Sequence, residues 1–381
     1  MARNRQNKLR EAIPIPPPAP LPDPEVIDVQ SILNEYLSGN IDLIVVLGPT
    51  ASGKTKYTVN LARRITSLAA SDSRLQPARR SEERCDEREA QGPEAEGFGN
   101  ISPHRGARGG ESLGSLCEPE GTLPPACEIL SADSRQIYKD MTIGTGKDLE
   151  EYGDVPYHLI DIVPAGTRFD LYQWQEAFEK AYKDIRERGQ IPILCGGTGL
   201  YIEAATCGYS LPQVPPNEEL RPELEQYPTE ELIKRLADLG PLPPEGVLQS
   251  KRRVIRALEV ALYEKDHPIR KSGYLPKKPY YIGTLVDREE RNARIDSRLD
   301  ARLQNGLVEE VKGLLDSGIR AEDLMYYGLE YKFVTQYVLG ILSYEEMRLL
   351  LGNAIHQFAK RQMTWFRGME KDGIKIHWTN V

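Results

Sequence analysis

The sequence has few cysteines and no long apolar run, and these shortages exclude several classes of protein. Its five cysteines form no C-x-x-C pair, so neither a zinc site of the usual spacing nor a disulfide framework is expected. No stretch approaches the ~18 consecutive apolar residues of a membrane-spanning helix. The charged first ten residues, which lead into prolines, lack the apolar core of a signal peptide. We therefore expect a cytoplasmic protein with no membrane contact.

Two segments have compositions that are unusual for a folded domain. Residues 71–126 consist mainly of glycine, proline, serine and glutamate, and they can bury too little surface to offset the entropy of the chain, so we predict a disordered insertion. Residues 1–40 contain a proline-rich run at 13–24 and are predicted to be a disordered extension. Within this extension a short amphipathic piece at residues 26–37 leads into the first strand.

The formal net charge of −8 does not exclude a nucleic-acid partner, because the charge is unevenly distributed. Residues 1–40 carry 4 basic and 5 acidic side chains, and residues 71–126 carry 7 and 11. The remainder has 38 basic and 41 acidic residues, so it is close to neutral. A near-neutral body can still present a local basic face.

The loop after the first predicted strand has the spacing of a phosphate-binding P-loop. An apolar run at residues 41–47 leads into this loop and a helical pattern at 56–65 follows it; the loop is Gly48, Pro49, Thr50, Ala51, Ser52, Gly53, Lys54 and Thr55. Backbone N–H groups at a helix start attract an anion, Lys54 adds a positive charge, and the Thr55 hydroxyl suits Mg²⁺. We predict a phosphate site with Thr55 as metal ligand. The loop alone does not distinguish a phosphoryl donor from a diphosphate leaving group.

Further strands alternate with helices, which predicts an α/β fold with a P-loop NTPase-like parallel sheet flanked by helices. A short strand ends at Asp133, an amphipathic helix spans residues 172–188, and a second strand runs from residue 190 into a glycine turn that contains Thr198. Strands are also predicted at 278–286 and 375–378. Parallel sheets bind ligands at the carboxyl ends of their strands, so the P-loop, Asp133 and Thr198 should lie together. Asp133 is a candidate base, with a metal or structural carboxylate as the alternative.

The rest of the chain divides into two parts. Residues 41–211 form the predicted core, 212–275 a small helical inserted domain, and 276–381 a return to the core. In the inserted domain, residues 218–239 and 249–262 are helical, and basic residues gather near the start of the second helix: Lys251, Arg252, Arg253 and Arg256. A positive cluster at a helix N-terminus opposes the helix dipole, which favours an anionic partner over an ordinary solvated face.

Two helical regions are predicted after the inserted domain. A long helix at 288–317 carries Arg294 and Arg298, and a last helical region covers 343–370. Within the latter, residues 358–367 mix basic residues with Trp365 and Phe366, which suits phosphate contact and base stacking. The alternative is a buried aromatic stripe with basic side chains outside.

Six sequence blocks, which occur here in the order that the family has, together resemble the bacterial tRNA dimethylallyltransferase family. The resemblance covers nearly the whole chain except residues 1–40 and 71–126. The blocks are Gly48-Pro-Thr-Ala-Ser-Gly-Lys-Thr55, Ser131-Ala-Asp-Ser-Arg-Gln-Ile-Tyr138, Tyr157-His-Leu-Ile-Asp161, Gly196-Gly-Thr-Gly-Leu-Tyr201, Arg256-Ala-Leu-Glu259 and Ala359-Lys-Arg-Gln-Met-Thr-Trp365. The resemblance implies transfer of a dimethylallyl group from its diphosphate to N6 of the tRNA adenosine immediately 3′ of the anticodon, with Mg²⁺ and release of pyrophosphate. The implied partners are the tRNA anticodon stem-loop and dimethylallyl diphosphate, and we expect a monomer.

The resemblance also implies roles for single residues. Asp133 is the implied base, Thr198 lies beside the target base, and Lys54, Arg294 and Arg298 neutralise the diphosphate. The implied tRNA contacts are Asp133, Ser134, Arg135, Gln136, Thr198, Arg221, Arg252, Arg253, Arg256, Arg361, Gln362, Trp365 and Arg367. The chain departs from the family at residues 325–330, where many members have basic residues around the glycine, and in its short inserted domain and the 71–126 insertion.

Three other functions fit parts of the sequence. A small-molecule P-loop kinase explains the loop but leaves the basic helix and residues 358–367 without a purpose. A prenyltransferase acting on free adenine nucleotides shares the core but has no need of tRNA-contacting segments. An RNA-binding module without catalysis does not explain Asp133 and Thr198 at strand ends beside a P-loop.

Overall fold

The computed structural model of the chain describes residues 20–72, 125–207, 214, 217–243, 245–267 and 275–381. Residues 73–124 of the predicted insertion at 71–126 and most of the proline-rich run at 13–24 lie outside these residues, whereas Ser71 is the last residue of the helix Lys54–Ser71. Among the residues that are described, no helix has the length and apolar character needed to cross a membrane.

The core is a six-stranded sheet in the order β3-β2-β4-β1-β5-β6, with all neighbouring strands parallel. Its strands are β1 Leu43–Leu47, β2 Cys127–Ser131, β3 Tyr157–His158, β4 Ile191–Gly196, β5 Pro279–Leu285 and β6 Ile376–Asn380. Every residue of β1 is buried, as expected for a parallel strand that is covered on both faces. The predicted α/β fold is confirmed, including the two late strands.

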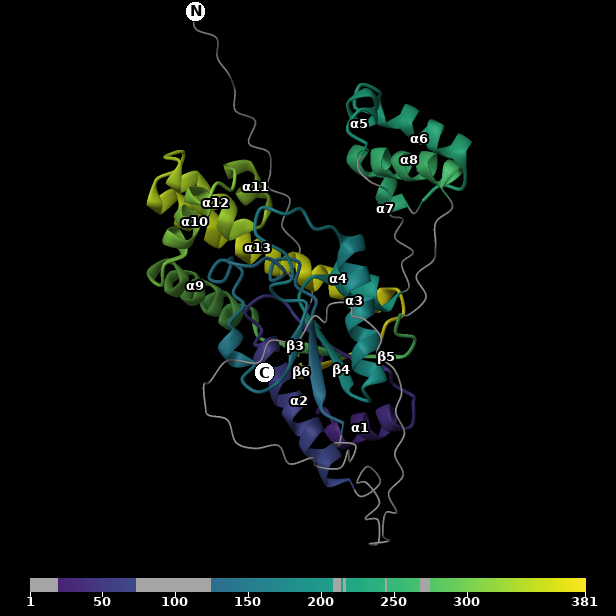
Figure 1. The fold of residues 1–381 in the computed structure, drawn as a ribbon, viewed down its shortest axis with the longest axis vertical. Helices are drawn as coiled ribbons and strands as arrows, with labels where there is room; N and C mark the ends of the chain where they lie inside the picture. Colours follow the sequence, from purple (N-terminus) through teal and green to yellow (C-terminus); the bar gives the residue numbers. More distant parts are fainter. Residues whose placement is uncertain (1–19, 73–124, 208–213, 215–216, 244, 268–274) are drawn as a thin grey trace, which may run out of the picture.

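Helices cover both faces of this sheet (Figure 1). Along β1, Ile44 and Val46 belong to one hydrophobic cluster and Val45 to the other, because successive side chains of a strand point to opposite faces. The first cluster is covered by α1 Val29–Leu37 and α2 Lys54–Ser71. The second is covered by α3 Leu171–Glu187, α4 Gly199–Thr206 and the C-terminal helices.

Helix α1 lies in the region that the sequence assigned to the extension. Val29, Ile32 and Leu33 are buried against the face that α2 covers. The Asp28 side chain accepts hydrogen bonds from two backbone N–H groups at the start of the helix. The packed core therefore begins before residue 41, and the prediction of a disordered extension is wrong for residues 29–37.

The C-terminal region is more divided than the sequence suggested. It comprises α9 Arg288–Gln304, α10 Leu307–Asp316, α11 Ala321–Tyr326, α12 Leu329–Val338 and α13 Tyr344–Lys371. The prediction of a single long helix at 288–317 is wrong, because the chain turns at Gly306, whose φ is +99°. The last predicted helical region is present as α13, which starts with a capping box formed by Ser343 and Glu346.

The inserted segment forms a small helical unit with its own hydrophobic cluster, and it stands apart from the sheet in Figure 1. Its helices are α5 Leu220–Leu224, α6 Thr229–Leu239, α7 Glu245–Leu248 and α8 Lys251–Asp266. The one helix predicted at 218–239 is interrupted before Pro228, which precedes the first turn of α6.

A buried charge network ties β2 to β3 and to the end of α3. Glu128 is 5% exposed, and its Oε2 lies 2.6 Å from Nε2 of His158 and 2.9 Å from Nη2 of Arg188. Burial alone would raise the pKa of Glu128, but hydrogen bonds from Arg188 and His158 outweigh burial and lower the pKa to about 2. Because the pKa is lower in the folded state, this stabilisation is present above the ordinary value of 4.5 and is lost as the pH falls toward 2.

Replacing Glu128 with Gln should lower the free energy of unfolding at neutral pH by roughly 1–3 kcal/mol, because charged hydrogen bonds to Arg188 and His158 are lost. The variant should also lose less stability than the wild type as the pH falls from 4.5 toward 2. Urea unfolding at a series of pH values measures both effects. Glu187→Gln, which removes an exposed partner of Lys183, is the control. Equal losses in the two variants would contradict the role of Glu128.

Candidate functional site

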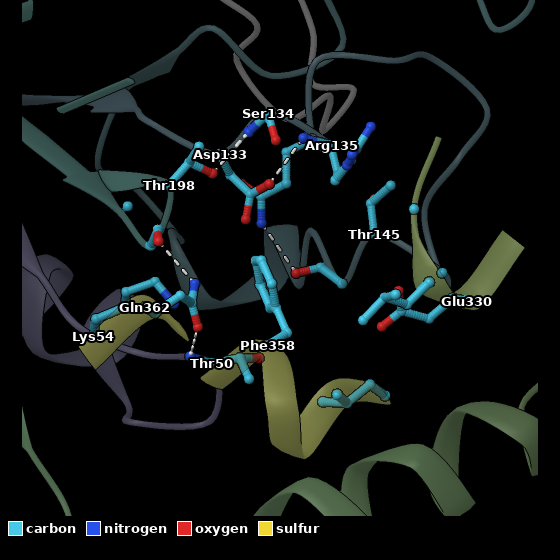
Figure 2. Close-up of a pocket in the computed structure, with 18 of the residues that line it drawn as sticks. Thr50, Lys54, Asp133, Ser134, Arg135, Thr145, Thr198, Glu330, Phe358 and Gln362 are labelled. Carbon is cyan, nitrogen blue, oxygen red and sulfur yellow. Dashed lines mark hydrogen bonds between the residues drawn. The ribbon is translucent and has the colours of Figure 1, made fainter. Parts of the chain in front are cut away.

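A cavity of about 610 Å³ lies at the carboxyl ends of β1, β2 and β4 (Figure 2). Thr50, Lys54 and Thr55 line it from the loop after β1, and Asp133 lines it from the turn after β2. The glycine turn after β4 contributes Thr198. The structure therefore brings together the three strand ends that the sequence singled out, which is the position where parallel α/β sheets hold ligands.

The P-loop bends into α2 in the way its glycines predict. Gly53 has a φ of +76° and precedes the first residue of the helix, Lys54. Gly48 needs to be glycine because a Cβ there would lie 2.0 Å from Oγ1 of Thr284. Ser52 hydrogen-bonds that same hydroxyl at 2.7 Å, so its side chain is committed to the sheet. Accordingly, part of the predicted loop shapes the site without lining it: Gly48, Pro49, Ala51, Ser52 and Gly53.

Lys54 brings a positive charge to the P-loop end of the cavity. Burial lowers the pKa of its ammonium group, while the nearby Cys195 and Asp133 act in the opposite direction. An anion bound in the loop would favour the charged form of Lys54. The loop is thus built for an anionic ligand.

The oxygen groups near the loop fit Mg²⁺ in the form that binds with substrate phosphates. The described residues contain no cluster of three or more His, Cys, Asp or Glu that would form a protein-only metal site. Mg²⁺ usually retains several waters and is held by one or two protein oxygens together with phosphates. The Thr55 hydroxyl, on the wall of the cavity, meets this requirement.

The turn after β2 presents the Asp133 carboxylate to the cavity. Oδ1 accepts a hydrogen bond from the backbone N–H of Arg135 at 2.8 Å, which fixes the orientation of the side chain. For Oδ2 the structure shows no hydrogen-bond partner within the described part of the chain. The Ser134 N–H donates to Oγ1 of Thr198 at 3.3 Å, so the Asp133 turn and the glycine turn are joined directly. Figure 2 shows Asp133, Ser134 and Thr198 on one side of the cavity.

The neighbouring residues of this turn are held within the protein. Gln136 is buried, accepts a hydrogen bond from Ser131 Oγ at 3.1 Å and donates one to the Gly146 carbonyl at 3.1 Å. Arg135 lines the cavity and donates to the Tyr326 carbonyl at 3.2 Å. The side-chain amide of Gln136, which was predicted to contact tRNA, is therefore hydrogen-bonded within the protein through both its oxygen and its nitrogen.

Two arginines of α9 reach the cavity. Arg298 forms an ion pair with Asp148, and Arg302 lies 3.4 Å from Glu330. Burial lowers the pKa of Arg302 and raises the pKa of Glu330, so the pair stabilises two charges that burial disfavours. Arg294 does not line the cavity; it pairs with Glu290 at 2.6 Å, on the side of the helix near Gly53.

Helix α13 forms the opposite wall with residues at helical spacing: Phe358, Arg361, Gln362 and Trp365. Phe358 is 38% exposed and Trp365 is 40% exposed, whereas Phe366 is fully buried. The alternative of a wholly buried aromatic stripe is therefore wrong for two of the three rings. Arg367 lies outside the cavity lining and donates to the Pro20 carbonyl at 2.9 Å.

The basic residues of the inserted domain that the structure describes do not line the cavity, and two of them are paired with a buried carboxylate. Glu259 has a side-chain exposure of only 1%; Arg221 Nε lies 2.8 Å from its Oε1, and Arg256 Nη1 lies 2.7 Å from its Oε2. These two arginines neutralise a buried carboxylate, a structural task that the tRNA-contact prediction did not include. Arg252 and Arg253 are exposed, and Arg253 also donates to the Gly246 carbonyl at 3.1 Å.

Sequence reasoning missed the loop at residues 142–146. Gly144, Thr145 and Gly146 line the cavity, and Glu310 of α10 holds the loop by accepting backbone hydrogen bonds from residues 142, 143 and 144 at 2.9, 2.7 and 3.0 Å. The glycine-rich run at 144–147 was the available signal. Segment 325–330, a departure from the family pattern, also lines the cavity except at Tyr327.

Comparisons with known proteins agree on one family. The IPP transferase family model matches residues 136–369. The chain is 55% identical over 258 residues to tRNA dimethylallyltransferase 2 of Porphyromonas gingivalis, covering 67% of this chain and 85% of that protein. It is 41% identical over 356 residues to tRNA dimethylallyltransferase 1 of Azobacteroides pseudotrichonymphae, covering 92% and 94%.

Solved structures show the same likeness. The full-length tRNA isopentenylpyrophosphate transferase of Bacillus halodurans superposes with a TM-score of 0.54 at 29% identity, covering 89% of each chain. A eukaryotic dimethylallyltransferase acting on tRNA, at 19% identity and a TM-score of 0.57, shares the fold. The family resemblance inferred from the six blocks is confirmed.

Inorganic pyrophosphate should bind the P-loop more weakly as the pH rises. Anion binding raises the pKa of Lys54, so binding takes up protons, and affinity falls as the pH passes the lowered pKa of the free protein, below the ordinary 10.5. Calorimetric titration in two buffers of different ionisation enthalpy measures the proton uptake.

Lys54→Met should weaken pyrophosphate binding roughly 10- to 100-fold, the loss of one or two charged hydrogen bonds, and should remove the part of the pH dependence that comes from the lysine. Lys56→Met, which removes an exposed lysine of the same helix, is the control and should keep both. Unchanged affinity in Lys54→Met would show that the anion binds elsewhere.

Proposed function

This chain belongs to the tRNA dimethylallyltransferase family, and from that premise we propose that it transfers a dimethylallyl group from dimethylallyl diphosphate to N6 of the tRNA adenosine immediately 3′ of the anticodon. It is a tRNA-prenylating enzyme; the donor, the target atom and the roles of single residues are the proposal. One observation carries it: the P-loop lysine, Lys54, and the carboxylate of Asp133 line the same cavity.

The proposed reaction needs an anion site and a proton acceptor at opposite ends of the prenyl group. The N6 lone pair of adenine forms a bond to C1 of the dimethylallyl group, the C1–O bond breaks, and pyrophosphate leaves with the electron pair. The N6 proton passes to the Asp133 carboxylate, whose Oδ1 is already held by the Arg135 N–H. The Asp133 carboxylate can act as a base only when the amine of the adenine is placed beside it. The glycine turn, whose Thr198 hydroxyl is hydrogen-bonded to the Ser134 N–H next to Asp133, is in position to hold the adenine there.

Negative charge that develops on the leaving diphosphate is met by the P-loop. Lys54 and the N–H groups at the start of α2 face the anion, and Arg298, which also pairs with Asp148, adds a guanidinium from α9. Mg²⁺, held by Thr55 and the phosphates, would supply further charge neutralisation. Arg294, one turn before Arg298, contributes to the field near Gly53 without lining the cavity.

The adenosine must leave its stack in the anticodon loop to reach Asp133. We propose that it is flipped into the cavity from the side of α13, where Phe358 and Trp365 offer exposed rings and Arg361 a cation. Arg252 and Arg253 of the inserted domain contribute phosphate contacts. The exposed rings distinguish this proposal from a small-molecule kinase or a prenyltransferase of free nucleotides, which have no use for them. We expect the protein to act as a monomer in the cytoplasm.

Asp133→Asn should reduce the single-turnover rate of prenyl transfer by roughly 10²–10⁴, because the amide keeps the shape of the side chain but cannot accept the proton. The affinity for tRNA should change little. The assay combines unmodified tRNA, dimethylallyl diphosphate and Mg²⁺ with excess enzyme, and mass analysis of the digested tRNA detects prenylated adenosine.

Asp140→Asn, an equal change at an exposed position of the following loop, is the control and should react at the wild-type rate. Near-normal chemistry in Asp133→Asn would leave Asp133 as a metal or structural carboxylate. No prenylated adenosine with the wild-type protein would overturn the proposed reaction itself.

Two arginines of α8 should respond differently to replacement by alanine. Arg252→Ala should weaken tRNA binding and reduce the slope of log affinity against log salt by about 1, since one phosphate contact is lost. Arg256→Ala should instead lower the melting temperature, because Glu259 loses a partner. Filter binding at several salt concentrations and thermal melting separate these effects. An unchanged salt slope in Arg252→Ala would remove Arg252 from the tRNA interface.

A further inference from the structure

The carboxamide of Gln362 joins two loops of the cavity that are far apart in the sequence. Its Oε1 accepts a hydrogen bond from the Thr50 N–H at 2.8 Å, and its Nε2 donates one to the Gly197 carbonyl at 2.8 Å. Gln362 is only 7% exposed, and Figure 2 shows its side chain pointing from α13 into the space between the P-loop and the glycine turn. Both polar ends of this buried amide are therefore used within the protein.

Helix α13 approaches the glycine turn so closely that side chains there are excluded. A Cβ on Gly197 would lie 2.4 Å from Nε2 of Gln362, and a Cβ on Gly199 would lie 2.3 Å from Cδ1 of Trp365. Neither glycine has a left-handed φ, so close approach, and not backbone conformation, requires them. Gln362 and Trp365, three residues apart on α13, therefore both pack closely against the turn that carries Thr198.

We propose that Gln362 is a positioning residue that fixes the spacing between the diphosphate end and the nucleobase end of the cavity, and that it is not a tRNA contact. The inference rests on the proposed function, in which the P-loop holds the diphosphate and the Asp133 and Thr198 turns hold the adenosine. Thr50 belongs to the diphosphate end and Gly197 adjoins the nucleobase end, so the Gln362 side chain sets the position of one end relative to the other.

The chemistry of the amide explains why a donor and an acceptor are needed on one side chain. The Thr50 N–H requires an acceptor and the Gly197 carbonyl requires a donor, and only a neutral amide of this length supplies both at once. Reaction between an amine and a prenyl carbon depends on contact geometry, and a misplacement of about 1 Å can cost roughly 10² in rate. Loss of the amide should therefore affect the chemical step more than the binding of either substrate.

Gln362→Met removes both hydrogen bonds at similar volume. The expected result is a single-turnover rate lower by roughly 10–10², with the dissociation constants for tRNA and for pyrophosphate within about threefold of wild type. Gln175→Met is the matched control: Gln175 is a buried glutamine of α3, outside the cavity, whose Nε2 donates to the Ala204 carbonyl at 2.6 Å. This control should lose thermal stability to a similar extent but keep its rate.

Gln362→Glu separates the two hydrogen bonds. Its carboxylate can still accept from Thr50 but cannot donate to the Gly197 carbonyl, so the rate should fall while the P-loop stays ordered. Hydrogen exchange of peptides covering residues 48–54 tests the order directly. Exchange at the Thr50 amide should accelerate in Gln362→Met and remain slow in Gln362→Glu and Gln175→Met.

Three outcomes would overturn the inference: wild-type rates in both Gln362 variants, tRNA affinity lost in proportion to the rate, or unchanged exchange of residues 48–54 in Gln362→Met. The exchange measurement needs no tRNA and no turnover. A protein that fails to prenylate tRNA yet shows the expected exchange pattern would contradict the proposed function while leaving the link between the loops in place.

Discussion

The site depends on the parallel arrangement of β1, β2 and β4. Because parallel strands place all their carboxyl ends at one edge of a sheet, the loops that follow them meet, although the residues concerned are far apart in the sequence. The P-loop, the Asp133 turn and the glycine turn are three of the loops at this edge. The Ser134 N–H on Thr198 and the Gln362 amide between the P-loop and Gly197 then fix them against each other. This constraint brings the P-loop and the Asp133 carboxylate to one cavity.

Helix α13 completes the cavity by crossing over the loops, and its sequence has to satisfy both of its sides. Ala359, Met363 and Phe366 face the core, whereas Phe358, Arg361 and Trp365 face the cavity. Gln362 lies between these two groups and is the residue whose polar atoms bind the loops. The mixture of basic and aromatic residues therefore reflects three tasks of one short stretch of helix: it packs against the core, holds the two loops in place and lines the cavity.

The parts of this arrangement that follow local rules were predictable from the sequence. The P-loop, the strand ends at Asp133 and Thr198, and the final helix follow from glycine spacing and apolar periodicity. What remained hidden were contacts between distant segments. The pairing of Arg221 with Glu259 and the hydrogen bonds from the backbone of residues 142–144 to Glu310 have no local signal. Gly306 was visible, but a glycine within a helical pattern does not by itself show that the chain turns there.

Arginines in this chain show why charge alone does not identify a binding surface. Arg256 and Arg252 are four residues apart on α8, yet Arg256 is committed to a buried carboxylate and Arg252 is exposed. A buried carboxylate without a cation is costly, so the fold retains the cations that satisfy it whatever the partner. Lys54 differs from these arginines, because burial disfavours its charge and an anion bound in the P-loop would compensate for that burial. Whether a cation is structural or ligand-binding therefore depends on the partner that it has in the folded protein. Counting basic residues in the sequence does not reveal that partner.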